Sequence, residues 1–492
     1  GGDDNVKLGD GHDVINTGPG LDLVLAGRGQ DFVVLGTDAG SEVFGGEGND
    51  FVLGNITAER ILGNEGDDWI EHGTFDGAPG DNFDEIFARD GIDGHDVFFG
   101  LGGFDEYIGE GGDDIMVGSA GRGKMAGMSG FDWATYKDNT LGVNADLSIP
   151  IVFDEAPTLP QNAALDEFES MEGLSGSRFN DVLTGSEATA ADRLPAAQGG
   201  TEGFAGSALD AEGIALIAGL QELLGPGVTS FSAGDIILGG DGSDVMRGLA
   251  GDDIIDGDKW LDVQIGVFAV NDVNHTGTPI ALHKSMTTLA NSMFNGTINP
   301  GQLSIVRTIR NSNDQPDSDG IADIDRAVFS GARAEYDITF NANGTVTVAH
   351  TGGLATDGTD TIRNVEVLDF TDQDISLLAP TLDLNGDVTT VTTAAQAYRD
   401  TFDNAAHNNS NGTVAWAATP WVEANDPSGG SAVTNGQIQL DAGGGGGSNE
   451  LRFLNGDGAQ ITRTVNLSGL TSATLSFTYD RLNNNNSIDA GE

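Results

Sequence analysis

A nine-residue period constrains the fold of this chain more than any other feature. Residues 1–36 divide without a gap into four nonapeptides, GGDDNVKLG, DGHDVINTG, PGLDLVLAG and RGQDFVVLG. Each copy joins a glycine-rich turn to three or four β-forming residues. Because glycine permits the positive φ angles of sharp turns, each copy predicts a tight turn followed by a short strand.

The same pattern returns further along the chain. Copies occur at 45–53 and 63–71, five follow one another over 91–135, and a third group comprises 176–184 and 239–256. One short strand with a single inward side chain cannot bury a core, whereas stacked coils can. We therefore predict an all-β fold: a parallel β-roll (a β-solenoid) with two nonapeptides per coil, so that residues 18 apart stack.

Stacking of this kind places carboxylates on top of one another. Adjacent rungs lie about 4.8 Å apart. Two carboxylates at that distance repel each other by about 0.9 kcal/mol in water and by about 3.5 kcal/mol at an effective dielectric constant of 20. A hard cation between the rungs reverses the sign, and calcium–oxygen distances of about 2.3–2.6 Å suit the gap. Magnesium demands a tighter octahedron, and zinc prefers the nitrogen and sulfur ligands that these turns lack.

The spacing resembles the glycine- and aspartate-rich nonapeptide of RTX (repeats-in-toxin) calcium-binding proteins over 1–135, 173–185 and 232–257. By resemblance, each turn gives its aspartate and loop carbonyls to a calcium ion shared with the turn one coil away. The candidate ligands in the repeats are Asp4, Asp13, Asp22, Asp31, Asp50, Asp68, Asp96, Asp105, Asp114, Asp132, Asp181, Asp235, Asp244 and Asp253.

The two-copy coil predicts which carboxylates form pairs. The predicted pairs are Asp4/Asp22, Asp13/Asp31, Asp50/Asp68, Asp96/Asp114, Asp114/Asp132 and Asp235/Asp253. Asp105 stacks on Gly123, so that site should be weak, and residues 37–44 and 54–62 lack the turn. The alternative interpretation is a solenoid without calcium, whose aspartates only cap turns.

The remaining segments divide the chain into further units. We predict a connector over 136–185, an insertion with one helix over 186–231, a β-rich module over 258–380 and a truncated β-sandwich-like module over 381–492. Ser207 and Asp210 are candidate caps for the helix, and 336–349 reads as a hairpin around Asn341–Gly344. Alternate carboxylates at Asp317, Asp319 and Asp323 form either a separate calcium loop or an acidic surface turn.

A second resemblance concerns residues 232–380. The segments 257–263, 298–303 and 327–336 resemble the tail of large bacterial animal-type haem peroxidases, in which an RTX region follows the catalytic domain. This resemblance implies a peroxidase parent whose haem lies in a catalytic domain outside this chain. We predict no catalytic or cofactor-binding residue here, because the seven histidines are scattered and no nucleophile or zinc motif occurs.

Composition narrows the function. With 77 acidic and 21 basic residues, the net charge is −56, which disfavours nucleic acid as a partner. No stretch reaches the roughly 18 apolar residues of a membrane span. We expect a fragment of an exported bacterial protein, extracellular or on the cell surface, that folds on calcium and by resemblance uses type I secretion. The alternative is the stalk and ligand-binding part of a calcium-dependent surface adhesin or S-layer-like protein. In the 381–492 module, Trp416 and Trp421 either stack on a glycan or pack in the core of the sandwich.

Overall fold

The structure is a computed structural model of the chain. It describes residues 2–36, 40–54, 60–71, 94–100, 104–119, 121–152, 166–315, 323–354 and 356–377, with the backbone alone at 104, 105 and six short strands between 381 and 476. The chain forms two units, one comprising 1–365 with 369–373, the other 366–368 with 374–492. Each is described by itself.

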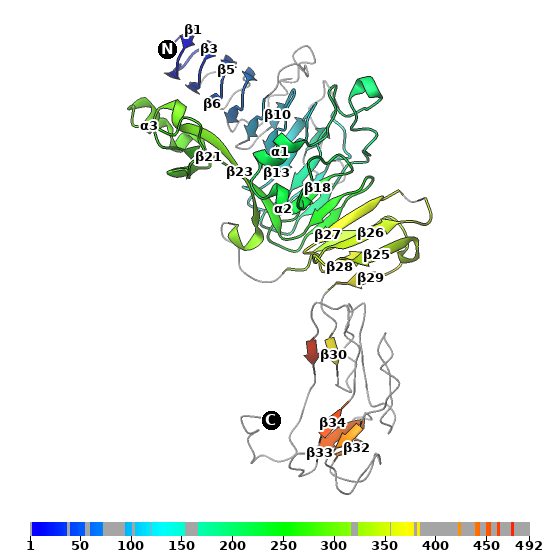
Figure 1. Ribbon diagram of the computed structural model, residues 1–492. Helices are drawn as coiled ribbons and strands as arrows, with labels where there is room; N and C mark the ends of the chain where they lie inside the picture. The colour runs from blue at the N-terminus through cyan, green and yellow to red at the C-terminus, as the bar shows by residue number, and fades with distance from the viewer. Residues whose placement is uncertain are drawn as a thin grey trace, which may run out of the picture. The chain divides into compact units, whose positions relative to one another are not determined.

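The first unit is built around a roll of short parallel strands (Figure 1). Val6 lies opposite Val24, as predicted for residues 18 apart, and Val24 lies opposite Val43 after a step of 19. The extra residue falls in the segment 37–44, where the sequence pattern slips by one. The larger sheet also bridges 28 residues, since Trp69 pairs with Val97.

The larger sheet has 13 strands, and its first eleven run parallel. In spatial order they are β2 (Val14–Asn16), β4 (Phe32–Val34), β6 (Phe51–Leu53), β8 (Trp69–Glu71), β9 (Val97–Phe99), β11 (Ile115–Val117), β13 (Trp133–Thr135), β16 (Gly173–Ser175), β18 (Ile236–Leu238), β20 (Ile254–Asp256), β27 (Thr359–Arg363), β26 (Val346–His350) and β25 (Tyr336–Phe340).

Shorter parallel sheets contain the other strands of the coils. The first holds β1 (Asn5–Asp10), β3 (Leu23–Arg28), β5 (Glu42–Glu47) and β7 (Arg60–Glu65). The second holds β10 (Phe104–Ile108), β12 (Arg122–Ala126) and β15 (Glu167–Glu169). The third begins with β14 (Asn144–Asp146), β17 (Val182–Thr184), β19 (Val245–Arg247) and β24 (Arg326–Val328).

The glycines of the turns allow the coils to approach closely. Gly29 has φ +121°, and a Cβ atom at this position would lie 1.8 Å from the carbonyl oxygen of Gly11 in the preceding coil. Both the left-handed backbone and this approach exclude a side chain.

The larger sheet is buried on both faces. Val33 and Val52 point into the roll and pack with Val24 and Val43 of the opposite sheet. The alternate residues on the outer face are also apolar and form a second, larger core. Its members in the repeats include Phe32, Phe51, Trp69, Val97, Ile115, Trp133 and Ile236. Strands covered on both faces read as continuous apolar runs, as DFVVL and DIIL do here.

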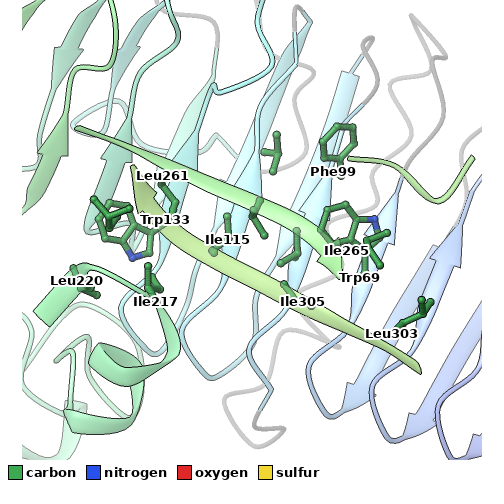
Figure 2. Packing of buried hydrophobic residues seen from close by; sticks show 14 of the residues in the cluster. Trp69, Phe99, Ile115, Trp133, Ile217, Leu220, Leu261, Ile265, Leu303 and Ile305 are labelled. Atoms are coloured by element: carbon green, nitrogen blue, oxygen red, sulfur yellow. The ribbon is translucent and has the colours of Figure 1, made fainter. Parts of the chain in front are cut away.

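A long antiparallel ribbon covers this outer face. We call residues 258–315 the strap; its ladder pairs β21 (Lys259–Val267) with β23 (Leu303–Asn311), and β22 (Ala281–His283) adds to the edge. Figure 2 shows β21 and β23 lying across the strands, over Trp69, Ile115 and Trp133. The strap is fixed near both ends, because Gln30 Nε2 donates to the Leu303 carbonyl (2.7 Å) and Leu261 N donates to Ser175 Oγ (3.0 Å).

The insertion 186–231 contains two short helices where one was predicted. They are α1 (Ala211–Leu216) and α2 (Leu220–Leu224); α3 (Ala290–Phe294) belongs to the strap. Asp210 caps α1 by accepting from the N–H groups of Glu212 and Gly213. The helix breaks because Ala218 forms backbone hydrogen bonds with strap residues Arg307 and Ile309, and Gly219 adopts φ +91°.

The roll also extends past its predicted end at residue 257. β24 stacks on β19 and β27 stacks on β20, both in parallel, so the β-rich module supplies two further rungs. The predicted hairpin is confirmed by the pairing of β25 with β26. Asn364 adopts φ +47° and separates β27 from β28 (Val367–Asp369).

The second unit is described only as short strands. Besides β28 they are β29 (Asp374–Ser376), β30 (Thr381–Asp383), β31 (Val422–Ala424), β32 (Ile438–Ala442), β33 (Asn449–Phe453), β34 (Gln460–Thr462) and β35 (Thr474–Ser476). Trp416 and Trp421 lie outside the described residues, so the sandwich and its glycan partner stay predictions. Within the part of the chain that is described, no helix is long and apolar enough to cross a membrane.

Candidate calcium centre

Aspartates at the start of successive strands form a continuous file along the larger sheet. In each step, the backbone N–H of one aspartate donates to Oδ1 of the aspartate one coil further on. The distance is 2.7 Å from Asp13 to Asp31, 2.8 Å from Asp31 to Asp50 and 2.6 Å from Asp50 to Asp68. The same contact links Asp68 to Asp96, Asp96 to Asp114 and Asp114 to Asp132. We call this file the carboxylate ladder.

The carboxylate ladder is longer than the repeats predicted. Asp132 N donates to Glu172 Oε2 (2.9 Å), and Ile236, directly after Asp235, pairs with the residue after Glu172. Asp235 N donates to Asp253 Oδ1 (2.6 Å), and Asp253 N to Asp360 Oδ1 (3.0 Å). Glu172 and Asp360 were missed by the sequence reasoning. Asp360 had a local signal, because Gly358-Thr-Asp-Thr-Ile362 keeps the glycine, aspartate and inward apolar positions of a repeat.

Two shorter files follow the same rule. Asp181 Oδ1 accepts from Val143 N (2.7 Å), Asp181 N donates to Asp244 Oδ1 (2.7 Å), and Asp244 N donates to Asp325 Oδ1 (2.8 Å). Asp4 N donates to Asp22 Oδ1 (2.9 Å). Asp325 also escaped prediction, because its strand follows the strap and lies 81 residues from the rung beneath.

All six predicted carboxylate pairs are neighbours in these files. Asp105 lies opposite Gly123, as expected. Asp317 and Asp319 lie outside the described residues, so the separate calcium loop stays a prediction. Their predicted partner Asp323 accepts from Gly242 N (3.1 Å).

The second oxygen of most ladder carboxylates is buried without a hydrogen-bond partner among the described residues. Eight aspartates, each at most 2% exposed, have such an Oδ2 atom. They are Asp22, Asp31, Asp50, Asp68, Asp114, Asp132, Asp244 and Asp253. Buried polar atoms of native proteins are almost always paired, and an unpaired buried charge is costly. Burial raises the pKa of Asp50 to about 7 and that of Asp244 to about 9.

Four of the orphaned oxygens, those of Asp50, Asp114, Asp132 and Asp244, lie beside both a glycine and a backbone carbonyl. A Cβ atom on Gly45 would lie 2.5 Å from Asp50 Oδ2 and 2.5 Å from the Gly63 carbonyl oxygen. Gly239 has the same relation to Asp244 Oδ2 and the Gly257 carbonyl. The missing side chains therefore leave space between two kinds of oxygen donor. Among the described residues, no three histidine or carboxylate side chains converge on one point, so carbonyl oxygens would have to complete a shell.

This donor set fits calcium. Calcium takes six to eight oxygen ligands from carboxylates and carbonyls in flexible geometry, and the orphaned Oδ2 atoms and turn carbonyls are of those types. The residues that would hold it are the eight aspartates with an unpaired Oδ2, six in the carboxylate ladder and two, Asp22 and Asp244, in the shorter files.

The turns before these eight aspartates share one backbone conformation. In every case the residue four positions earlier has positive φ; these residues are Gly18, Gly27, Gly46, Asn64, Glu110, Met128, Gly240 and Leu249. Left-handed backbone costs a non-glycine residue about 1–2 kcal/mol. Its retention at Glu110, Met128 and Leu249 shows that the turn shape is imposed by its surroundings.

Asp181 and Asp235 are different. Four residues before Asp181 stands Ser177, which is not left-handed; its N–H donates to Asp181 Oδ2 (2.5 Å) and its hydroxyl to Oδ1 (2.9 Å). Ser186 gives Asp235 the same two bonds, at 2.5 and 3.1 Å. Both oxygens of these two carboxylates are therefore satisfied by the protein.

The histidines in the turns have a structural role. His12 Nδ1 accepts from Gln30 N (2.9 Å), and His95 Nδ1 accepts from Asp113 N (2.8 Å), each one coil further on. These contacts join adjacent coils beside the carboxylate ladder.

Comparison with known families agrees with this geometry. Residues 1–33, 35–70, 90–125 and 230–259 match the RTX calcium-binding nonapeptide repeat. These are RTX repeats. The four copies cover well under half of the chain, and the match omits the RTX-like segment 173–185, where Ser177 lies. RTX repeats bind calcium and are typical of secreted bacterial proteins. No curated protein matches the chain, and nothing in these matches supports a relation to haem peroxidases.

Proposed function

We propose that the RTX region is a calcium-driven folding element of an exported bacterial protein. It stays largely unfolded where calcium is scarce and folds on reaching calcium outside the cell. The observation that carries this proposal is the set of eight buried Oδ2 atoms that the described residues leave without a partner.

The energetics support a switch. Burial first, then mutual repulsion, raises the pKa of Asp68, Asp114 and Asp253 well above the usual value, so the ion-free ladder opposes folding at neutral pH. Calcium supplies positive charge and oxygen coordination at these atoms when bound. A ligand that binds only the folded state stabilises it by RT ln(1 + [L]/Kd) per site. Several weak sites in one file thus add to a large shift.

The identity of the parent protein is a separate and finer proposal. A haem peroxidase parent rests on the resemblance of three short segments. They cover the turn after β20 and the first part of β21, the residues up to the start of β23, and the stretch from β24 to β25. Each of them also builds the roll or the strap, so they serve folding in this chain. We assign no catalytic group to the chain itself.

The direct test is far-UV circular dichroism of the full chain during a calcium titration, with magnesium as the control ion. We expect a cooperative gain of β signal with calcium and little change with magnesium, because magnesium requires a tight octahedron. A β spectrum already complete in chelator would overturn the folding switch and favour a constitutive solenoid.

A further inference from the structure

One buried cation reaches the carboxylate ladder from outside the repeats. Arg193 belongs to the insertion 186–231 and is only 1% exposed. Its Nη1 donates to the Gly234 carbonyl and its Nη2 to Asp235 Oδ1. Its side chain contributes nothing to the surface, so its contacts lie inside the ladder.

Arg193 lies where three buried carboxylates stack. Glu172 is one rung before Asp235, and Asp253 is one rung after it. All three are at most 1% exposed. Glu172 Oε1 and Arg193 Nε have no hydrogen-bond partner among the described residues, but they carry opposite charges. No comparable side chain donates to the ladder carboxylates Asp50 and Asp68 within the part described, where Oδ2 stays unpaired.

Arg193 contacts the two kinds of oxygen that a metal ion would use, a carboxylate oxygen and a turn carbonyl, although the atoms it reaches are Asp235 Oδ1 and Gly234 O rather than Oδ2. At Asp235, as at Asp50, a glycine without a side chain (Gly185) separates the carboxylate from a backbone carbonyl: its Cβ would lie 2.5 Å from Asp235 Oδ2 and 2.5 Å from the Gly248 oxygen. The guanidinium binds one carboxylate oxygen and one turn carbonyl. A planar, always-charged group suits such buried recognition of oxygen acceptors.

We propose that Arg193 is a built-in cation that takes the place of a calcium ion at the Asp235 rung. The charge of the Asp235 carboxylate is then neutralised by Arg193 of the insertion. Ser186 N donates to Asp235 Oδ2, the oxygen that the guanidinium does not contact. The idea rests on the calcium sites proposed for the other rungs. It adds that the ladder contains one position that calcium does not fill.

Ion counting by native mass spectrometry of the full chain at saturating calcium tests this directly. In a Ser186→Gly background, which frees Asp235 Oδ2, Arg193→Met should bind one calcium ion more than the chain that keeps Arg193, because the space and the oxygen donors then become available. In the same background, Arg193→Lys keeps a charge and should match the chain that keeps Arg193. Arg28→Met is the matched control, since Arg28 is exposed and pairs with Glu47 on the surface.

Hydrogen exchange locates the effect. In calcium-free buffer, amides of β18 should exchange about tenfold faster in the Ser186→Gly, Arg193→Met chain than in Ser186→Gly alone, and calcium should restore their protection. An unchanged ion count, or lost protection that calcium does not restore, would show that Arg193 is only a structural ion pair.

A second comparison applies if Arg193→Met does not fold. Asp50→Asn should lower the calcium count of the otherwise native chain, whereas Asp235→Asn should leave it unchanged. Loss of an ion from Asp235→Asn would overturn the proposal. These counts are read at saturating calcium, so they stay informative if the chain proves to be folded in chelator and the folding switch fails.

Discussion

The rungs at Asp50 and at Asp181 are built from the same nonapeptide but solve the problem of a buried carboxylate in different ways. At Asp50 the residue four positions earlier is the left-handed Gly46, and Oδ2 has no partner among the described residues. At Asp181 it is Ser177, whose N–H and hydroxyl satisfy both oxygens. One residue in the turn thus separates a rung that requires an ion from one that does not. Rungs with an unpaired Oδ2 predominate over residues 2–71, whereas the rungs with a serine turn lie in the middle of the roll.

The largest expected effect is regional. In calcium-free buffer, amides of β4, β6 and β8 should exchange about 100-fold faster than with calcium, and those of β17 and β18 should change less than about tenfold. Hydrogen exchange resolved by peptide measures both regions in one sample. Equal responses would erase the distinction between the two kinds of rung.

Protonation should make the two regions behave alike. Burial raises the pKa of Asp50 and of Asp181 to about 7. A carboxyl whose folded pKa is raised stabilises the fold fully below its unfolded pKa of about 4 and loses that contribution as pH rises to about 7. Without calcium, β signal should therefore increase as pH falls from 7 to 5. Circular dichroism in calcium-free buffer checks this, and a β signal that decreased over that range would contradict it.

Matched substitutions sharpen the comparison residue by residue. Asp50→Asn should raise the calcium concentration for half-folding about tenfold, equivalent to about 1.4 kcal/mol, because a charged ligand is lost. Asp181→Asn should leave that midpoint unchanged and lower the free energy of unfolding by about 1–3 kcal/mol, since buried donors lose a charged acceptor.

Calcium titrations and urea unfolding of both variants provide these values. Asp10→Asn is the control, because Asp10 is exposed at the end of β1. If Asp181→Asn shifted the calcium midpoint as far as Asp50→Asn, the serine turn would not replace an ion.

The smallest expected effect concerns the serine itself. Ser177→Gly removes the hydroxyl bond to Asp181 and permits the left-handed turn, so it should destabilise the calcium-free chain by about 1 kcal/mol. It should also create one new calcium site, which ion counting detects. A calcium count equal to that of the wild type would mean that the backbone keeps its turn without the hydroxyl.

Local periodicity made much of the roll predictable. The nine-residue step specifies the turn, the inward side chain and the position of each aspartate, and these are contacts between residues 18 or 19 apart. Asp325 and Asp360 were missed because the strap separates them from the rungs beneath, although Gly358 and Ile362 keep the repeat pattern around Asp360.

The parts that were not predicted depend on distant segments. The apolar outer-face residues Phe32, Trp69 and Trp133 were not predicted to be covered, and nothing local identifies residues 259–311 as the cover. The break between α1 and α2 follows from hydrogen bonds between Ala218 and the strap. The spacing of the repeats could not predict the role of Arg193. Arg193 and Ser186 both contact Asp235, and 49 residues separate Ser186 from Asp235.

The position of the strap in the chain also determines when the outer face of the first coils can be covered during synthesis. Phe51 and Trp69 are made early, yet the strap residues that cover this face, such as Leu303, follow more than 200 positions later in the chain. At synthesis rates of about 5–20 residues per second, the outer face of the first coils stays bare for roughly ten seconds or more. A polypeptide arranged in this order cannot cover the outer face of its first coils until Leu303 and the rest of β23 have been made, whatever ions are present.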